Sequence, residues 1–249
     1  MTPKQFRIQT LNAIDAAGLS RSPADRYEVG AGVQNPHALL LRSAKLHDTP
    51  IPESVLAVAR AGAGTNNIPV AALTERGVPV FNTPGANANA VKELVLAGLF
   101  IASRNLIPAA RFAHTLQGDD AAIAAAVEAG KKRFVGFELP GRTLGIIGLG
   151  AIGVQVANAA LGLGLRVVGY DPAISVEHAW LLSSEVERAQ SIDEVFRRAD
   201  ILTVHVPLIP STEGLVSTQK IAMMKPTAVI LDFARAEIVD TEAVVTALD

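Results

Sequence analysis

The sequence predicts an α/β protein with two domains, each built on a parallel sheet with helices on its faces. Three observations lead to this prediction. Short apolar runs typical of buried strands alternate with segments of helical character along the chain. The 249 residues suffice for two domains that each bury a core. A glycine-rich turn between a strand and a helix lies past the midpoint, so another unit precedes it.

The first domain is expected over residues 1–89. Its second predicted helix ends at Gly77, because glycine is the usual residue just after a helix C-terminus. Val58–Ala61 is open to a second interpretation, as a strand that overlaps the end of the first helix. The predicted elements are a strand at Ala38–Arg42, helices at Pro52–Ala59 and Pro69–Arg76, and a strand at Val78–Phe81.

The second domain is expected over residues 90–249, and one long apolar helix at Asn87–Arg104 leads into it. Residues 105–140 are expected to form a linking arm with an alanine-rich helix at Asp119–Ala129. Beyond the arm, strands and helices alternate again. The strands are predicted at Thr143–Ile147, Leu165–Tyr170, Ile201–Val206 and Ala228–Asp232, and the helices at Ile152–Leu161, Ile192–Arg197 and Ser217–Met224.

The most specific local signal is the G-x-G-x-x-G spacing of Gly148, Gly150 and Gly153. It follows a strand and opens a helix, which is the context that a dinucleotide site requires. The first glycine permits a tight turn, the second lets the backbone approach a pyrophosphate, and the third lets helix and strand pack closely. The N–H groups of a helix N-terminus bind such a group, so Ala151 and Ile152 join the candidate cofactor-binding residues.

Asp171 lies at the end of the next predicted strand. An acidic residue at this point can bind both ribose hydroxyls of the adenosine and repel a 2′-phosphate, which favours NAD over NADP. The alternative is a turn aspartate before Pro172. The position at the strand end favours the ribose role.

Two further strand ends are expected at the same ligand site. One strand runs into Val206 and Pro207, which favours a backbone facing a bound cofactor. The last predicted strand is followed by Phe233, Ala234 and Arg235. Because strand C-termini face the ligand crevice of a doubly wound sheet, the arginine can grip a substrate carboxylate with two parallel donors. A solvated surface charge is the alternative.

Composition excludes several classes of function. The 22 basic and 24 acidic residues give a net charge of −2, without the basic field that nucleic acid requires. The absence of cysteine excludes disulfides, thiolate metal sites and a cysteine nucleophile, and favours a cytoplasmic location. The N-terminal sequence lacks the apolar segment of a secretory signal, and the longest apolar run is too short for a membrane span. We expect no nucleic-acid, membrane or metal partner.

Several motifs together resemble the NAD-dependent D-2-hydroxyacid dehydrogenases. They are Gly141–Gly153, Tyr170–Pro172, His205–Pro207 and Phe233–Asp240. Arg60–Asn67 and Phe81–Leu94 are similar to the branch of that family that oxidises phosphoglycerate. The resemblance covers nearly the whole chain. It implies a flavodoxin-like substrate domain, a Rossmann doubly wound NAD-binding domain, and oxidation of 3-phospho-D-glycerate to 3-phosphohydroxypyruvate in L-serine biosynthesis.

The resemblance also implies roles for single residues. Arg235 corresponds to the arginine that binds the carboxylate and carbonyl of the substrate. The loop whose backbone N–H groups cradle that carboxylate comprises Gly62, Ala63 and Gly64. Arg42 and Arg60 stand where family members contact the phosphate end, and two arginines suit a dianion. Surface solvation or structural pairing is the alternative for both.

The arm of residues 105–140 corresponds to the segment through which family members form dimers, which implies a homodimer. Lys131, Lys132 and Arg133 lie in this arm, where family members sometimes approach the partner's substrate. For these three residues a solvated run of charges is the favoured interpretation.

The chain departs from the family pattern in two places. Ala236 stands where glycine usually follows the arginine. In the family a glutamate and then a histidine, the general acid/base, lie further downstream, and both would fall beyond Asp249. We therefore expect a C-terminally truncated chain, whose first domain lacks its returning segment and whose second lacks its last strands. His205 is expected to be a buried scaffold residue, not a substitute catalyst.

Two alternatives stay open. The chain could be a dehydrogenase for another D-2-hydroxy acid, an interpretation that Arg42 and Arg60 oppose. It could also be a non-catalytic NAD-binding or interaction module, which the missing acid/base favours.

Overall fold

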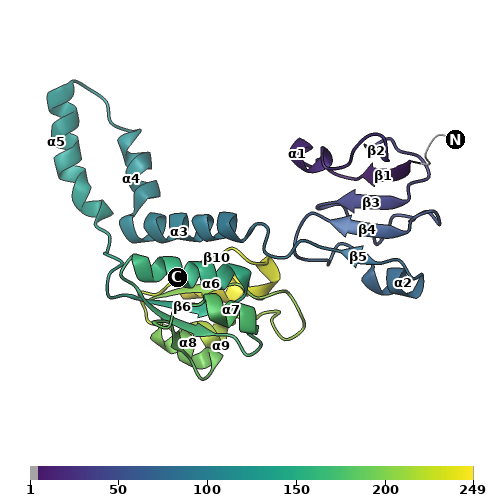
Figure 1. Ribbon diagram of the computed structural model, residues 1–249. Coiled ribbons are helices and arrows are strands. Elements are labelled where there is room, and N and C mark those ends of the chain that lie inside the picture. Colours follow the sequence, from purple (N-terminus) through teal and green to yellow (C-terminus); the bar gives the residue numbers. More distant parts are fainter. Residues whose placement is uncertain (1–4, 249) are drawn as a thin grey trace. The chain divides into compact units, whose positions relative to one another are not determined.

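The chain consists of two compact units, each with its own sheet and core. The computed structural model describes residues 5–248. The N-terminal unit comprises Met1–Asn87 and the C-terminal unit Ala88–Asp249. Figure 1 colours the first from purple to blue and the second from teal to yellow. Among the helices within the described residues, none is both long and apolar enough to cross a membrane.

The N-terminal unit carries a five-stranded sheet of order β2-β1-β3-β4-β5 with parallel neighbours. This is the flavodoxin-like order. Its elements are β1 (Phe6–Thr10), α1 (Ala16–Leu19), β2 (Tyr27–Gly30), β3 (Ala38–Leu41), β4 (Ala57–Arg60), α2 (Val70–Glu75) and β5 (Val80–Phe81). The core joins Leu41 of β3, Val58 of β4 and Leu73 of α2, all buried.

The helix predicted over Pro52–Ala59 is wrong. Residues 51–56 form irregular chain and a turn, and a strand begins at Ala57, so the alternative strand interpretation fits better. The apolar residues Ile51, Val55 and Val58 have helical spacing and do pack in the core, but the chain between them runs through a turn and irregular segments. The N–H of Val55 donates to the carbonyl of Pro52, which closes a single turn at this point. Gly77 follows α2 with φ +68°, as expected of a helix-ending glycine.

The C-terminal unit contains a second parallel sheet, of order β10-β9-β6-β7-β8. Renumbered within this unit, that is the Rossmann order read from one edge. Its strands are β6 (Thr143–Ile147), β7 (Arg166–Tyr170), β8 (Glu187–Arg188), β9 (Ile201–Val204) and β10 (Val229–Asp232). Its helices are α3 (Ala88–Arg104), α4 (Leu106–Ala113), α5 (Asp120–Gly130), η1 (Lys131–Phe134), α6 (Ala151–Gly162), α7 (Val176–Leu181), α8 (Ile192–Arg198), α9 (Thr218–Ile221), η2 (Ala236–Ile238) and α10 (Thr241–Leu248).

Helices cover both faces of this second sheet. On one face, α3 and α6 pack through Leu99 and Val156. On the other face, α8 packs through Phe196, together with Ile238. All five residues of β6 are buried, because a central parallel strand is covered on both sides. This double burial explains why the strand appears in the sequence as a mostly apolar run, with the buried Thr143 as its one polar residue.

An arm of two helices, α4 and α5, projects from the rest of the C-terminal unit (Figure 1). It begins at Asn105, whose left-handed backbone (φ 50°) separates α3 from α4. The Nδ2 of Asn105 donates to the carbonyl of Val135, and the N–H of Phe137 donates to the carbonyl of Ser103. The chain therefore leaves and re-enters the unit at one point. Sequence reasoning predicted α5 but not α4.

Candidate functional site

The glycine turn between β6 and α6 is held in a conformation that requires glycine. Gly148 has φ +94°, and a Cβ there would lie 2.5 Å from the carbonyl oxygen of His205. A Cβ on Gly153 would lie 2.0 Å from the carbonyl oxygen of Gly148. The turn is therefore packed against itself and against the end of β9. Neither position has room for any other residue.

Gly150 differs from its two neighbours, because a Cβ there would meet no atom within 4 Å. The position that this Cβ would occupy faces open space at the N-terminus of α6, where Gly150 is the N-cap. The first N–H groups of a helix lack intrahelical acceptors, so those of Ala151 and Ile152 can bind an anion. The open space beside these donors fits a pyrophosphate that approaches the backbone closely.

Asp171 lies at the end of β7 and makes two hydrogen bonds to the backbone. One carboxylate oxygen accepts the N–H of Leu149 inside the glycine turn at 2.8 Å, and the other accepts the N–H of Ala173 at 2.8 Å. The bond to Ala173 corresponds to the alternative interpretation of Asp171 as a turn aspartate before Pro172. Each carboxylate oxygen can accept a further bond, so these contacts leave capacity for ribose hydroxyls. The carboxylate also fixes the turn to the adjacent strand.

His205 follows β9 and lies behind the glycine turn. Its N–H donates to the carbonyl of Ile147 at 2.7 Å, and its Nε2 lies 3.0 Å from Oγ1 of Thr203, which is fully buried. Burial lowers the pKa of His205 from 6.5 to about 4, so the ring is neutral near pH 7. The structure places it as a scaffold residue, as the sequence predicts.

The remaining predicted residues of this unit follow β9 and β10. Val206 is half-buried and Pro207 exposed, directly after the strand end. The Phe233 ring packs against α3, 3.1 Å from where a Cβ on Gly98 would lie. Arg235 is exposed, and its Nη1 donates to the carbonyl of Ala234 at 3.0 Å. Strands β6, β7, β9 and β10 are neighbours in one parallel sheet, so their C-terminal ends lie along the same side of it. The glycine turn, Asp171, Pro207 and Arg235 follow these ends and therefore lie on that side.

In the N-terminal unit, Arg42 and Arg60 also lie at neighbouring strand ends. Arg60 is the last residue of β4 and pairs in register with Leu41, so Arg42 comes directly beyond it. The Nε of Arg60 donates to the carbonyl of Arg42 at 2.9 Å, and its Nη1 donates to the carbonyl of Gly64. Arg60 therefore shapes the loop of Gly62, Ala63 and Gly64. The Arg42 side chain is exposed.

Two asparagines that the sequence analysis missed hold this region together. Oδ1 of Asn12 accepts three backbone N–H groups, those of Arg42, Ser43 and Ala44. Nδ2 of Asn67 donates to the carbonyl of Ala44 at 2.7 Å, while its buried Oδ1 has no partner among the described residues. No local signal marks Asn12, because its position just beyond β1 has meaning only once β1 is known to be the parallel neighbour of β3.

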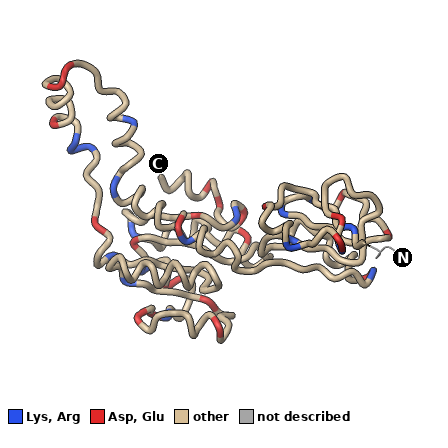
Figure 2. Tube along the Cα trace, turned by 45° about the horizontal axis from the view of Figure 1, so that its top comes forward, with Lys and Arg blue, Asp and Glu red and all other residues tan. Residues whose placement is uncertain are grey.

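The basic residues of the arm serve different purposes. Lys131 pairs with Glu128 at the surface. The Arg133 guanidinium lies 4.7 Å from the Phe112 ring centroid and 5.5 Å from that of Phe134, which ties η1 to α4. Lys132 is exposed. Figure 2 shows basic and acidic residues interspersed along the trace of both units.

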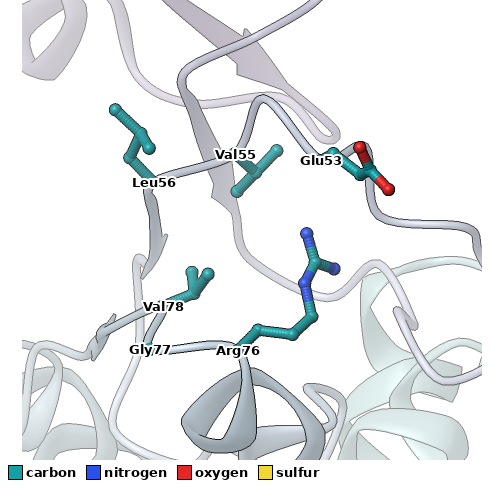
Figure 3. Close-up of a pocket in the computed structure, with 6 residues that line it drawn as sticks. All are labelled: Glu53, Val55, Leu56, Arg76, Gly77 and Val78. Carbon is teal, nitrogen blue, oxygen red and sulfur yellow. The ribbon is translucent and has the colours of Figure 1, made fainter.

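A pocket of about 340 Å³ lies elsewhere in the N-terminal unit (Figure 3). It is lined by Glu53, Val55, Leu56, Arg76, Gly77 and Val78. Val55 and Val78 precede β4 and β5, so the pocket lies at the opposite edge of the sheet from Arg42 and Arg60. The Arg76 guanidinium is bonded to the carbonyls of Ile51 and Pro52. The pocket is separate from the candidate site.

Comparisons with known proteins agree with this geometry. The chain is 41% identical over 196 residues to D-3-phosphoglycerate dehydrogenase of Methanocaldococcus jannaschii, covering 79% of this chain and 35% of that protein. It is 38% identical over 230 residues to the Mycobacterium tuberculosis protein of the same name, covering 90% and 40%. The chain thus spans less than half the length of these relatives.

Solved structures show the same fold. The apo D-mandelate dehydrogenase of Rhodotorula graminis is similar with a TM-score of 0.79 and 28% identity, over 98% of this chain and 78% of that one. NAD+-bound 3-phosphoglycerate dehydrogenase of Entamoeba histolytica matches with a TM-score of 0.71 at 24% identity, over 98% and 77%.

The family model described as "D-isomer specific 2-hydroxyacid dehydrogenase, NAD binding domain" matches residues 99–249. Those residues include the glycine turn, Asp171 and Arg235. The chain belongs to the D-isomer-specific 2-hydroxyacid dehydrogenase family, and its C-terminal unit is an NAD-binding domain.

Proposed function

We propose that this chain belongs to an NAD-dependent dehydrogenase that oxidises 3-phospho-D-glycerate to 3-phosphohydroxypyruvate, in the biosynthesis of L-serine. The observation that carries the choice of substrate is the placement of Arg42 and Arg60 at adjacent ends of β3 and β4. Two guanidinium groups at one sheet edge suit a dianionic phosphate. The relatives named D-3-phosphoglycerate dehydrogenase support the same choice.

The two arginines contribute unequally to this proposal. Two donors of Arg60 are already bonded to the carbonyls of Arg42 and Gly64, so much of its role is to shape the loop. Arg42 has no side-chain hydrogen bond or ion pair within residues 5–248, and its side chain is exposed. We assign the main phosphate contact to Arg42. Within the N-terminal unit, the N–H groups of the 62–64 loop would receive the carboxylate.

In the C-terminal unit the residues present fit NAD. The N–H groups at the start of α6 would hold the pyrophosphate, with Gly150 leaving the space open. Asp171 would accept the ribose hydroxyls. Bound NAD+ would supply the hydride acceptor, and the protein orients the carbon that is oxidised. Val206, Pro207, Phe233 and Ala234 would line the cofactor from the other strand ends.

We assign proton transfer to none of the described histidines. His205 is buried and bonded to its own strand. His178 lies in α7 and His114 in the arm, and neither pairs with a carboxylate within residues 5–248. The second candidate function, left open by the sequence, is an interaction module that binds NAD without catalysis.

Cofactor binding is tested by titrating NAD+ into the purified chain and its Gly150→Ala variant in a calorimeter. The new methyl group would enter the space assigned to the pyrophosphate, so affinity should fall at least about tenfold while the melting temperature stays unchanged. Gly162→Ala is the matched control, since that glycine also faces open space but lies at the far end of α6. Equal NAD+ affinity in all three proteins would reject the proposed cofactor site.

The substrate is tested by measuring the binding of 3-phosphoglycerate and of D-lactate, and NADH formation from each. Arg42→Gln should weaken 3-phosphoglycerate binding about tenfold or more. Arg21→Gln is the control, because Arg21 is an exposed arginine of the same unit. Binding of NAD+ without binding of 3-phosphoglycerate or D-lactate would favour the module. Preference for D-lactate would favour another 2-hydroxy acid.

We further propose that the arm of residues 105–140 joins two copies of the chain in a cytoplasmic homodimer. Apolar side chains of the arm that are 39% exposed or more support this, namely Leu106, Ile107, Val127 and Val135. Light scattering after size-exclusion chromatography should give twice the chain mass of 26.0 kDa. A monomer at micromolar concentration would contradict the proposal.

A further inference from the structure

Three successive backbone N–H groups converge on one side-chain oxygen beyond the end of β3. Oδ1 of Asn12 accepts from the N–H of Arg42 at 3.0 Å, of Ser43 at 2.9 Å and of Ala44 at 2.9 Å. Consecutive N–H groups arranged in this way form a concavity that binds anionic oxygens in many proteins. Here the oxygen in that concavity belongs to a neutral carboxamide of the same unit.

The other side of the same turn is also held by side chains. The carbonyl of Arg42 accepts from Nε of Arg60 at 2.9 Å and from Nδ2 of Asn67 at 3.4 Å. The carbonyl of Ala44 accepts from Nδ2 of Asn67 at 2.7 Å. The backbone of the turn is thus fixed through both its N–H and its carbonyl groups. The Arg42 side chain extends from this fixed backbone and is exposed.

The charge of the group in the concavity matters for an anion that approaches Arg42. A carboxylate would accept the three N–H groups more strongly than an amide, because charge-assisted hydrogen bonds are the stronger ones. It would also place a negative charge against the backbone of the residue that we assign to the phosphate. Within about 10 Å, the Debye length at about 0.1 M salt, that charge would repel a dianion. A carboxamide satisfies the donors without this repulsion.

We propose that Asn12 is a positioning residue that also sets specificity for the phosphate end of the substrate. Its neutral oxygen shapes the 42–44 turn and leaves the positive charge of Arg42 uncompensated. The inference rests on the proposed function in one respect, that the ligand of Arg42 is the phosphate of the substrate. The positioning role itself rests on the hydrogen bonds.

The test compares Asn12→Asp and Asn12→Ala with the unchanged chain, by calorimetric titration with 3-phosphoglycerate and with D-glycerate. Asn12→Asp should melt at the same temperature or higher, yet bind 3-phosphoglycerate about tenfold more weakly. Affinity for D-glycerate should change less than threefold. Asn12→Ala should lower the melting temperature and weaken binding, because three donors lose their acceptor. NAD+ affinity, a property of the other unit, should stay constant in both variants.

Unchanged 3-phosphoglycerate affinity in Asn12→Asp would overturn the proposal, as would equal losses for the two ligands. A second readout separates it from the proposed function. Inorganic phosphate is titrated while the amide NMR signals of Arg42, Ser43 and Ala44 are followed. If the unchanged chain ignores 3-phosphoglycerate but phosphate shifts these signals, and Asn12→Asp abolishes the shift, the inference stands and the substrate assignment falls. If phosphate leaves all three signals unchanged, the inference falls.

Discussion

The two units hold their candidate ligand sites by opposite means. In the C-terminal unit the turn after β6 is shaped by glycines, which let backbone meet backbone at distances that no side chain allows. In the N-terminal unit the turn after β3 is shaped by Asn12, Asn67 and Arg60, whose polar atoms saturate the backbone groups. The first design is steric and tolerates no substitution at Gly148 or Gly153. The second is a set of separate hydrogen bonds, so single changes should weaken it by steps.

The largest effect should come from Gly153→Ala. The new Cβ would lie 2.0 Å from the carbonyl oxygen of Gly148, so helix α6 and the turn would have to separate. We expect the free energy of unfolding to fall by about 3 kcal/mol or more, measured by urea denaturation. Gly162→Ala in the same helix has open space and should stabilise by about 0.5–1 kcal/mol. A fully stable Gly153→Ala protein would refute the steric account.

The second effect concerns the histidine behind the glycine turn. Because burial lowers the pKa of His205 from 6.5 to about 4, the unfolded chain binds a proton there at a pH where the folded chain does not. The contribution to stability is therefore complete above pH 6.5 and is lost as the pH falls toward 4. It amounts to about 3 kcal/mol.

Urea denaturation at a series of pH values measures this loss. His205→Gln should flatten the stability profile between pH 4 and 6.5 relative to the unchanged chain. The exposed His114 provides the control, and His114→Gln should keep the slope. If the profiles of both variants coincide with that of the unchanged chain, His205 is not the group that titrates.

A smaller effect is expected for the polar clamp of the N-terminal unit. This name covers the hydrogen bonds that Asn12, Asn67 and Arg60 make to the turn at residues 42–44. Asn67→Ala removes the donor to the carbonyls of Arg42 and Ala44, at a cost of about 2 kcal/mol. Hydrogen exchange at the amides of residues 42–44 should accelerate, while exchange in β6 should not. Asn66→Ala is the control, since that side chain is exposed. Unchanged exchange at residues 42–44 would show that the turn does not depend on this clamp.

The smallest effect concerns a side chain of the C-terminal unit that bonds to the backbone. It lies at the N-terminal ends of the strands, away from the candidate ligand site. Asp200 accepts the N–H of Thr143 at 2.7 Å and pairs with Lys225 at 2.8 Å. Burial raises the pKa of Asp200, but the bonds from Lys225 and Thr143 outweigh it and leave the pKa below 3.8. The stabilisation is present above pH 3.8 and disappears as the pH falls below it.

Asp200→Asn should lower the free energy of unfolding by about 1 kcal/mol at pH 7, and the difference should vanish near pH 2. The same substitution at Asp232, Asp232→Asn, is the comparison, because Asp232 lies at the opposite end of the neighbouring strand β10. A difference that persists unchanged into acid would mean that the charge of Asp200 is not what matters.

The sequence predicts the C-terminal unit well, because buried parallel strands and glycine turns leave local traces. The strand at Thr143–Ile147 is confirmed at its predicted bounds, because a strand that is buried throughout leaves a mostly apolar run in the sequence. Strands β1 and β2 of the N-terminal unit were missed because polar residues interrupt them. The predicted helix over Pro52–Ala59 is wrong, because a turn, an irregular segment and the start of β4 bring apolar residues with helical spacing into the core.

The candidate site shows the same contrast. Gly148, Gly150 and Gly153 carry a spacing that can be recognised in a single sequence. Asn12 and Asn67 lie far from Arg42 along the chain, and only the pairing of β1, β3 and β4 brings them together. An asparagine beyond a strand end looks like any turn residue until its neighbours in the sheet are known. Long-range polar clamps are therefore invisible to local patterns.

The root of the arm has a consequence for how this family can change. The N–H of Phe137 bonds to the carbonyl of Ser103 at 2.8 Å, and a Cβ on Gly136 would lie 2.0 Å from that same oxygen. Everything from Asn105 to Val135 is thus an excursion whose two ends meet. Such an insert can lengthen, shrink or acquire a different surface without disturbing the register of a single strand. For the dimer proposed above, this means that the arm surface can change while the glycine turn of the cofactor-binding domain stays intact.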